Sequence, residues 1–423
     1  MLLQARDGAG RRYNGFMRVF LLFVVVCACA LRAADVVLDN ATVYPSPEAT
    51  PIADARVVIR DGHIAAIGPR ESTPAPDQAR VIDCSGKFVV AGFWNNHVHL
   101  IVPGLSVAAA PAADLNPLLD EMFNRWGFTH VFDLASNLAN AVLLRDRIVR
   151  GELRGPHILT VGDPLWTEPP IYVRELVTAK GLDVSVVTSP DDVAQRVAQL
   201  AEQGADGVKL FTGSMQAQLA VSNMPLAMVS AATRVARERK LPVFVHPQNG
   251  TGLETAINGG ANVIAHTIPQ MAPWTPELVA RLKQSRIALI PTLALFDFEA
   301  RKAMLPPAVS EGWLELMIGQ LRVFAAEGGE VLFGTDVGYT DAYDTTLEFQ
   351  LMARAGLTFP QILASLTTAP AARFGSGSDS GRVEAGATAD LVVLDEDPAQ
   401  DSTAFAKVHL TLRRGETIYA APR

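Results

Sequence analysis

The sequence predicts an α/β protein built as a (β/α)8 TIM barrel, with a small β-sandwich formed by the N- and C-terminal segments. Through the middle of the 423-residue chain, short apolar runs alternate with amphipathic helical patterns, which is typical of parallel strands covered by helices. Both ends instead carry strand patterns separated by turns, and this shared pattern indicates one small β-domain. Polar side chains end several apolar runs, where the active sites of such barrels lie.

The composition describes a globular protein. Apolar residues make up 49% of the chain and charged residues 19%, which excludes a disordered chain. The formal net charge of −8 argues against nucleic acid as a partner. We expect a small-molecule substrate and no nucleic-acid partner, and assembly into a homo-oligomer is left open.

Residues 1–34 have the pattern of a secretory signal peptide. Arg11, Arg12 and Arg18 precede an apolar run at residues 19–31, and small residues follow it. The run is short for a membrane-spanning helix, so we expect cleavage, a periplasmic or secreted location and no stable membrane association afterwards. Met17 is an alternative start, and an uncleaved anchor or lipidation at Cys29 are alternative fates of this segment.

The β-sandwich is expected to comprise residues 35–90 and 375–423. Asp61-Gly62 separates two apolar runs and predicts a tight hairpin. Strand patterns of the same character return near the C-terminus, at residues 389–394, 408–412 and 414–419.

The barrel is expected to occupy residues 91–374. Ser189-Pro190 and Thr275-Pro276 each predict the start of a helix, because each pair supplies a capping hydroxyl and a proline at the first helical position. The predicted strands lie at residues 93–99, 129–133, 157–161, 206–211, 242–246, 262–266, 287–292 and 331–336.

Metal-binding side chains gather at the ends of these strands. His97 and His99 are one residue apart, so a strand turns both imidazoles to one face, where they can bind one metal ion. Further candidates end or lie in other predicted strands: Lys209, His246, His266 and Asp336. Each has an ordinary alternative, which is an ion pair for Lys209, core burial for the histidines and a helix cap for Asp336. Their shared position at strand ends favours a metal centre.

Other polar residues are assigned on weaker grounds. His130 and His157 lie within predicted strands and are interpreted as structural. Four loop residues are candidates for contact with the substrate, with packing inside their loops as the alternative: Tyr172, Arg174, Tyr339 and Tyr343.

With these residues in place, the chain resembles the amidohydrolase superfamily, in particular its imidazolonepropionase-like and prolidase-like branch. The resemblance covers nearly the whole chain after the signal. It rests on the His-x-His pair, the strand lysine, the histidines that end the fifth and sixth strands, and Gly334-Thr335-Asp336 on the last strand. Secondary motifs agree, at residues 145–151, 155–157, 367–372 and 381–392.

The resemblance implies a centre with two divalent metal ions. The ligands divide into two sets, which are His97, His99 and Asp336 for the first ion and His246 and His266 for the second. Lys209 would be carboxylated to N6-carboxylysine and bridge both ions, since a carbamate supplies oxygen ligands that such ions accept. Zinc is the default metal, while manganese, iron or cobalt would use the same ligands.

The implied reaction is hydrolysis of a carbon–nitrogen bond in an amide, a dipeptide-like compound or an N-acyl amino acid. A hydroxide that bridges the two ions would attack the carbonyl. Asp336 would pass its proton to the leaving amine, with His266 as the next candidate for this catalytic role. Two alternatives keep the same fold: a lactonase or phosphotriesterase-like hydrolase, and a non-catalytic scaffold.

The chain departs from the family pattern near the site. Asn95-Asn96 stand before the His-x-His pair, Pro247-Gln248 follow the strand-5 histidine, and Ala265 stands where an acidic residue is frequent. Residues 163–170 replace the glycine-rich loop that many prolidase-like members carry after the third strand. No ligand is lost, but this last departure leaves the substrate class open.

Overall fold

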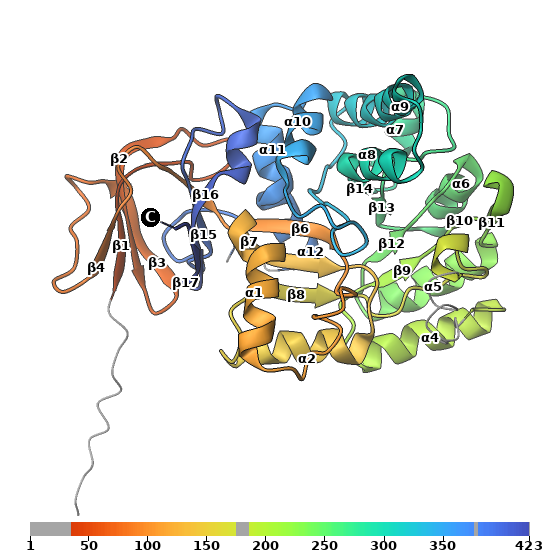
Figure 1. The fold of residues 1–423 in the computed structure, drawn as a ribbon, viewed down its shortest axis with the longest axis horizontal. Helices are drawn as coiled ribbons and strands as arrows, with labels where there is room; N and C mark the ends of the chain where they lie inside the picture. The colour runs from red at the N-terminus through yellow and green to blue at the C-terminus, as the bar shows by residue number, and fades with distance from the viewer. Residues whose placement is uncertain (1–34, 175–185, 376–379, 423) are drawn as a thin grey trace, which may run out of the picture. The chain divides into compact units, whose positions relative to one another are not determined.

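The computed structural model describes residues 35–174, 186–375 and 380–422 (Figure 1). These residues hold a mixed sheet made from both ends of the chain, parallel strands in the middle, and the helices between them. Within these ranges no helix has the length and apolar character needed to cross a membrane. The predicted signal peptide, residues 1–34, lies outside the described residues.

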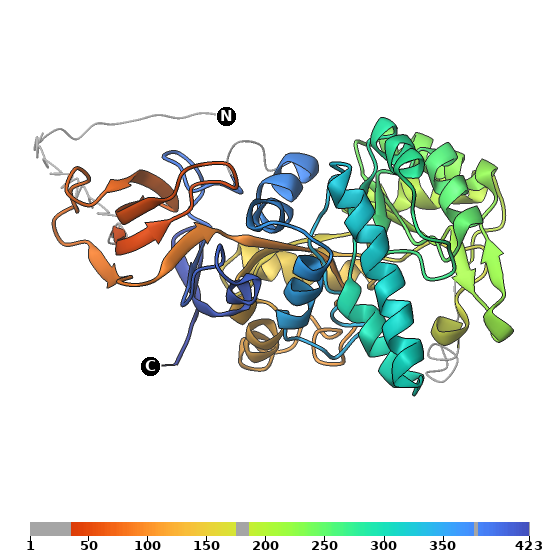
Figure 2. The same ribbon diagram turned by 90° about the horizontal axis from the view of Figure 1, so that it is seen from above.

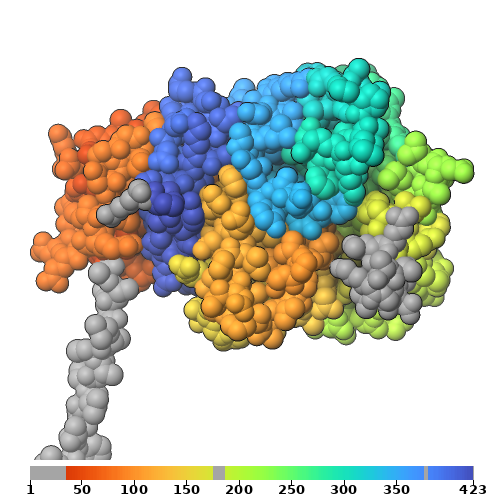
Figure 3. Space-filling view, in the orientation of Figure 1, coloured from red at the N-terminus to blue at the C-terminus, as the bar shows by residue number. Residues whose placement is uncertain are grey.

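Strands from both ends of the chain form one eight-stranded mixed sheet, as the sequence predicts for the terminal segments. The order is β17 (Glu416–Ala420), β16 (Val408–Arg413), β15 (Leu391–Leu394), β5 (Phe88–Ala91), β1 (Val36–Val43), β2 (Ile52–Arg60) and β3 (His63–Pro69), with β4 (Arg80–Asp83) beside β1. Antiparallel pairing of β5 with β15 joins the N-terminal strands to the C-terminal ones. Figures 2 and 3 show the red and orange N-terminal strands beside the dark blue C-terminal segment.

The predicted hairpin between β2 and β3 is confirmed. Asp61 and Gly62 both have positive φ, 50° and 81°, and Arg60 pairs with His63 across the turn. A two-residue turn of this kind matches the twist of the strands that it joins. The sheet encloses its own apolar cluster, in which Leu38 and Val393 are buried.

The parallel strands in the middle form two hydrogen-bonded sheets. One holds β6 (Phe93–Val98), β7 (Phe128–Asp133) and β8 (His157–Thr160), and the other holds β9 (Val208–Leu210), β12 (Val243–Val245), β13 (Val263–Ala265) and β14 (Ala288–Ile290). Single parallel bridges join Leu165 to Leu210, Leu289 to Val331 and Val98 to Val337. Residues 331–336, the last predicted strand, thus pair only through single bridges and not through a continuous run of strand hydrogen bonds. The hydrogen bonds therefore define two parallel sheets and do not by themselves establish a closed barrel.

Two predicted helix starts are confirmed. The hydroxyl of Ser189 accepts from the backbone nitrogen of Asp192 at 3.2 Å, and that of Thr275 accepts from Leu278 at 3.3 Å. The helices are α1 (Ala112–Met122), α2 (Leu138–Val149), α4 (Pro190–Glu202), α5 (Leu226–Glu238), α6 (Gly250–Gly259), α7 (Pro276–Gln284), α8 (Leu293–Lys302), α9 (Pro307–Ala326), α10 (Thr346–Arg354), α11 (Phe359–Leu366) and α12 (Thr368–Phe374). A short hairpin, β10 (Gly213–Met215) with β11 (Val221–Asn223), follows β9.

The inward side chains of the parallel strands form a packed apolar cluster. Phe132 and Phe244 meet with ring centroids 4.6 Å apart, and Ala288 and Leu332 belong to the same cluster. Because this interior is filled, polar side chains can gather only beyond it, at the carboxyl ends of the strands.

Candidate metal centre

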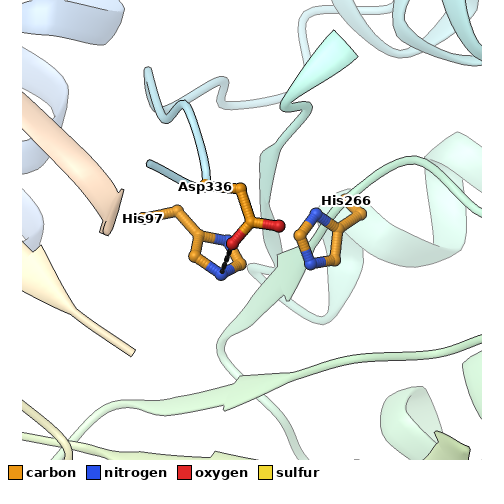
Figure 4. A group of neighbouring side chains, drawn as sticks. All are labelled: His97, His266 and Asp336. Atoms are coloured by element: carbon orange, nitrogen blue, oxygen red, sulfur yellow. Dashed lines mark ion pairs between the residues drawn. The ribbon is translucent and has the colours of Figure 1, made fainter. Parts of the chain in front are cut away.

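One oxygen of the Asp336 carboxylate contacts two imidazoles. Oδ1 lies 2.7 Å from Nε2 of His99 and 3.2 Å from Nε2 of His97. The ligating atoms of His97, His266 and Asp336 all lie within 4.8 Å of one another (Figure 4). This group combines histidines from both of the ligand sets that the family resemblance implies.

His246 and Lys209 lie next to this group. The rings of His246 and His266 are 4.9 Å apart between centroids, and His246 stacks on Phe211 at 4.7 Å. Nζ of Lys209 lies 5.7 Å from the centre of the Phe211 ring. The structure therefore brings all six predicted ligands into one cluster, in which His246 is half-buried and the other five are buried.

The charge states of the cluster suit metal binding. Burial, reinforced by neighbouring cations, holds the pKa of His97 and His266 far below the ordinary value and lowers the pKa of His246 to about 3. Burial also lowers the pKa of the Lys209 amine to about 7, although Asp336 opposes this shift. A neutral imidazole is the form that binds metal, and a neutral amine is the nucleophilic form.

A divalent metal ion fits the donors that are present. His97 is completely buried, yet among the described residues neither ring nitrogen has a hydrogen-bond partner, since its contact with Asp336 lacks hydrogen-bond geometry. Buried polar atoms are nearly always satisfied, so an unpartnered buried imidazole beside a carboxylate needs an explanation. A metal ion that accepts the lone pairs of both groups provides one.

Comparison with known proteins places the chain in a family. A model of the amidohydrolase family matches residues 88–418. The chain belongs to this family. A dihydroorotase from Citrifermentans bemidjiense is 24% identical over 390 residues, which cover 82% of this chain and 87% of the relative. An imidazolonepropionase from Methylobacterium nodulans is 25% identical over 405 residues, which cover 86% and 94%.

This amidohydrolase shares its fold with a protein of known structure. An Xaa-Pro dipeptidase with methionine bound in its active site matches with a TM-score of 0.79 at 22% identity, over 92% of this chain and 100% of that one. The α/β amidohydrolase fold and the distant relation to imidazolonepropionases, both predicted from the sequence, are confirmed, and the fold is shared with the Xaa-Pro dipeptidase.

The two asparagines that depart from the family pattern tie the first strand of this amidohydrolase to its last. Nδ2 of Asn95 donates to the Thr335 hydroxyl at 2.8 Å, and Nδ2 of Asn96 donates to a backbone carbonyl in the same segment at 2.8 Å. The backbone nitrogen of Asp336 donates to the carbonyl of His97 at 2.8 Å. These bonds hold His97 and Asp336 in register across the gap between the two strands.

Thr292, which the sequence did not single out, orients His266. Nδ1 of His266 lies 2.6 Å from Oγ1 of Thr292, and this hydroxyl donates to the Pro291 carbonyl at 2.8 Å. A hydroxyl that already donates must accept, so Nδ1 carries the hydrogen and Nε2 is free to bind metal. Thr292 has φ 45°, which is rare for a β-branched residue and is found mostly at functional sites. Its place at the end of a predicted strand is the signal that could have identified it.

Glu348 supports Thr292 from a neighbouring helix. This α10 residue is 1% exposed, and its carboxylate accepts from the backbone nitrogens of Leu293 and Ala294 at 3.0 and 2.7 Å. It therefore caps the start of α8, directly after Thr292. Burial raises the pKa of Glu348 to about 7. A glutamate in a helical pattern is usually exposed, so no sequence signal marked it.

Two of the four predicted substrate contacts come together beside the centre. The rings of Tyr172 and Tyr339 are 5.6 Å apart, and the backbone nitrogen of Tyr339 donates to the carbonyl of Asp336 at 3.2 Å. The Tyr339 hydroxyl donates to Glu299 at 2.8 Å and accepts from Lys302 at 3.1 Å, so two α8 residues that sequence reasoning missed join the pair.

The other two predicted substrate contacts have partners elsewhere. Arg174 forms an exposed ion pair with Glu168 at 3.2 Å. Tyr343 is partly buried and packs against the large apolar core. For all four residues, contact with a substrate stays a prediction.

Proposed function

We propose that this amidohydrolase is a secreted metal-dependent enzyme that hydrolyses a carbon–nitrogen bond in an amide, a dipeptide-like compound or an N-acyl amino acid. The Asp336 oxygen shared by His97 and His99, with His266 alongside, is the observation that supports it most strongly. A carboxylate among imidazoles can help bind a divalent ion and move a proton at the same place. The name of one structural relative, an Xaa-Pro dipeptidase, supports the bond class.

The proposed ligands are those that the family resemblance implies. His97, His99 and Asp336 would hold one divalent ion, His246 and His266 the second, and Lys209 would bridge them as N6-carboxylysine. Such ions, with zinc as the default, lower the pKa of a water molecule and polarise the scissile carbonyl. The lowered pKa of the buried Lys209 amine supports its carboxylation, because the neutral amine and not the ammonium ion attacks carbon dioxide.

The side chains of the centre have separate proposed roles. Asp336 accepts the proton of the attacking water and gives it to the leaving amine. Nδ1 of His99 lies 3.3 Å from the carbonyl of Ala135, and Nε2 hydrogen-bonds to Oδ1 of Asp336 at 2.7 Å, so these two contacts hold the imidazole beside the carboxylate. Tyr172 and Tyr339 are proposed to contact the substrate next to Asp336, where their rings lie together.

The proposal extends to the domains that surround the site. We propose that the parallel strands close into a (β/α)8 barrel at residues 91–374, that residues 35–90 and 375–423 form the sandwich, and that residues 1–34 direct export. The single bridges at Leu165, Leu289 and Val98 support closure, because each links segments that a closed barrel would make neighbours. The partner is a small molecule and not a nucleic acid.

Metal counting combined with a substrate panel tests the proposal. Protein loaded with zinc or manganese should hold about two ions per chain and hydrolyse some dipeptides or N-acyl amino acids. Activity on lactones or aryl phosphates alone would replace the proposed bond class. One ion or fewer after careful loading would overturn the bridging role of Lys209, and no bound metal at all would favour a non-catalytic scaffold.

A further inference from the structure

A second polar site lies outside the metal centre. A cleft of about 330 Å3 opens where β7 and β8 meet the C-terminal strands, and none of its lining residues belongs to the metal centre. Its polar lining includes His130, His157, Ser380, Asp390, Arg413 and Arg414. Two of these are the histidines that the sequence analysis assigned to structure alone.

Several donors in this cleft lack partners among the described residues. The hydroxyl of Ser380 is buried and makes no hydrogen bond. Among the described residues, the guanidinium of Arg413 makes one long hydrogen bond, to the carbonyl of Gly155 at 3.4 Å, and neither Arg413 nor Arg414 forms an ion pair. A buried hydroxyl and a guanidinium that lack partners among the described residues suit an added hydrogen-bond acceptor in this cleft.

The net charge of the cleft favours an anion. Burial, with repulsion from Arg413, lowers the pKa of His157 to about 4, and burial holds the pKa of His130 far below its ordinary value, so both imidazoles are neutral near pH 7. Two arginines, Arg413 and Arg414, then line the cleft with one carboxylate, that of Asp390. Arginine matches the geometry of phosphate and carboxylate oxygens.

Asp390 restricts which anion can fit. Its Oδ1 accepts from the backbone nitrogen of Arg414 at 2.7 Å, whereas Oδ2 lies 4.0 Å from Nε2 of His130, too far for a hydrogen bond between them. Nδ1 of His130 lies 3.0 Å from the Thr129 hydroxyl, which donates to a carbonyl, so Nε2 of His130 is an acceptor. Oδ2 of Asp390 and Nε2 of His130 are thus two neighbouring acceptors, and a ligand between them needs an O–H group to donate to one of them.

We propose that this cleft binds inorganic phosphate, through anionic oxygens on Arg413, Arg414 and Ser380 and through its own O–H group on Asp390. Phosphate retains a proton at neutral pH, whereas sulfate has none to donate to Asp390. A phosphate monoester loses its second proton near about pH 6, so at neutral pH it fits less well. The ligand is thus a protonated oxyanion, and the free ion is favoured over the ester.

Calorimetric titration of the metal-loaded protein with phosphate, sulfate and glycerol phosphate tests this inference. Phosphate should bind, and sulfate and the ester should bind at least about tenfold more weakly. Arg413→Gln and Ser380→Ala should each weaken phosphate binding, by about tenfold for the arginine. Arg237→Gln is the matched control, because Arg237 lines a separate cleft with Lys240.

The variant Asp390→Asn tests whether the Asp390 carboxylate is what makes the cleft prefer phosphate, which carries a proton, over sulfate, which does not. The asparagine keeps an acceptor for the Arg414 nitrogen but can donate to an oxyanion, so sulfate should gain affinity while phosphate loses its advantage. Phosphate that binds Arg413→Gln as tightly as wild type occupies another site, such as the metal centre, and this result would overturn the proposal. Equal binding of sulfate and phosphate to wild type would also overturn it. Circular dichroism checks that each variant is folded.

Discussion

Nδ1 of His266 lies 2.6 Å from Oγ1 of Thr292, and this contact decides which ring nitrogen of His266 is free for metal. Because the hydroxyl also donates to the Pro291 carbonyl, it can accept only from a protonated Nδ1. The left-handed backbone of both residues, φ 74° at His266 and φ 45° at Thr292, places the two side chains face to face.

Thr292→Val should weaken metal binding because it leaves Nδ1–H of His266 without an acceptor. We expect the affinity for zinc to fall by about 10- to 100-fold, the usual effect of removing such a partner. Thr292→Ser keeps the hydroxyl and is the matched control, with an affinity close to wild type. Competition with a coloured chelator measures both, and an unchanged affinity in the valine variant would refute this role.

Asp336→Asn should separate metal binding from proton transfer. The amide keeps the shape and one ligand oxygen of the side chain but cannot accept a proton at neutral pH. We therefore expect much of the metal to remain while kcat falls at least ~100-fold, and the acidic limb of the pH–rate profile to disappear. Near-normal turnover with metal bound would mean that another base acts, and His266 would be examined next.

Lys209→Ala should empty the centre of metal and abolish activity. The side chain is 2% exposed, so alanine leaves a cavity where the proposed carbamate would stand. Short carboxylic acids can occupy that cavity and supply two oxygens, so part of the activity should return when they are added. Elemental analysis and rate measurements with and without acetate test this. Full metal content without rescue agent would contradict the bridging role.

The buried carboxylate of Glu348 should make stability depend on pH. Its folded pKa of about 7 lies above the ordinary value of 4.5, so between these values the folded protein keeps a proton that the unfolded chain has lost. The stability from this proton is fully present below pH 4.5 and is lost as pH rises through 7. Between pH 5 and 8 the apparent free energy of unfolding should fall by about 2 to 3 kcal/mol more in wild type than in Glu348→Gln.

Urea unfolding at the two pH values measures this difference. Glu384→Gln, which changes an exposed glutamate, serves as the control and should follow wild type. A Glu348→Gln variant with the same pH dependence as wild type would show that the carboxylate does not titrate as its burial implies.

The ligands of the candidate centre could be predicted because their signals are local. Alternation along a strand turns His97 and His99 to one face, and an apolar run that stops at a polar residue marks a strand end wherever it lies in the chain. The mixed terminal sheet was predictable for a similar reason, since both ends carry the same strand and turn pattern. The helix starts at Ser189 and Thr275 depend only on neighbouring residues.

Only the tertiary structure determines which residues from distant segments of the chain come into contact. In the sequence, Glu348 has the pattern of an exposed helical residue. In the structure, α10 packs against the start of α8, so the Glu348 carboxylate is buried and accepts from two backbone nitrogens. His130 and Arg413 share a cleft only because the C-terminal strands return to the parallel ones. Residues 331–336 read as an ordinary strand, yet Asp336 adopts φ 61° and pairs through single bridges. Periodicity reports the local backbone and the buried face, whereas the partner of a side chain is set by packing, which no local pattern encodes.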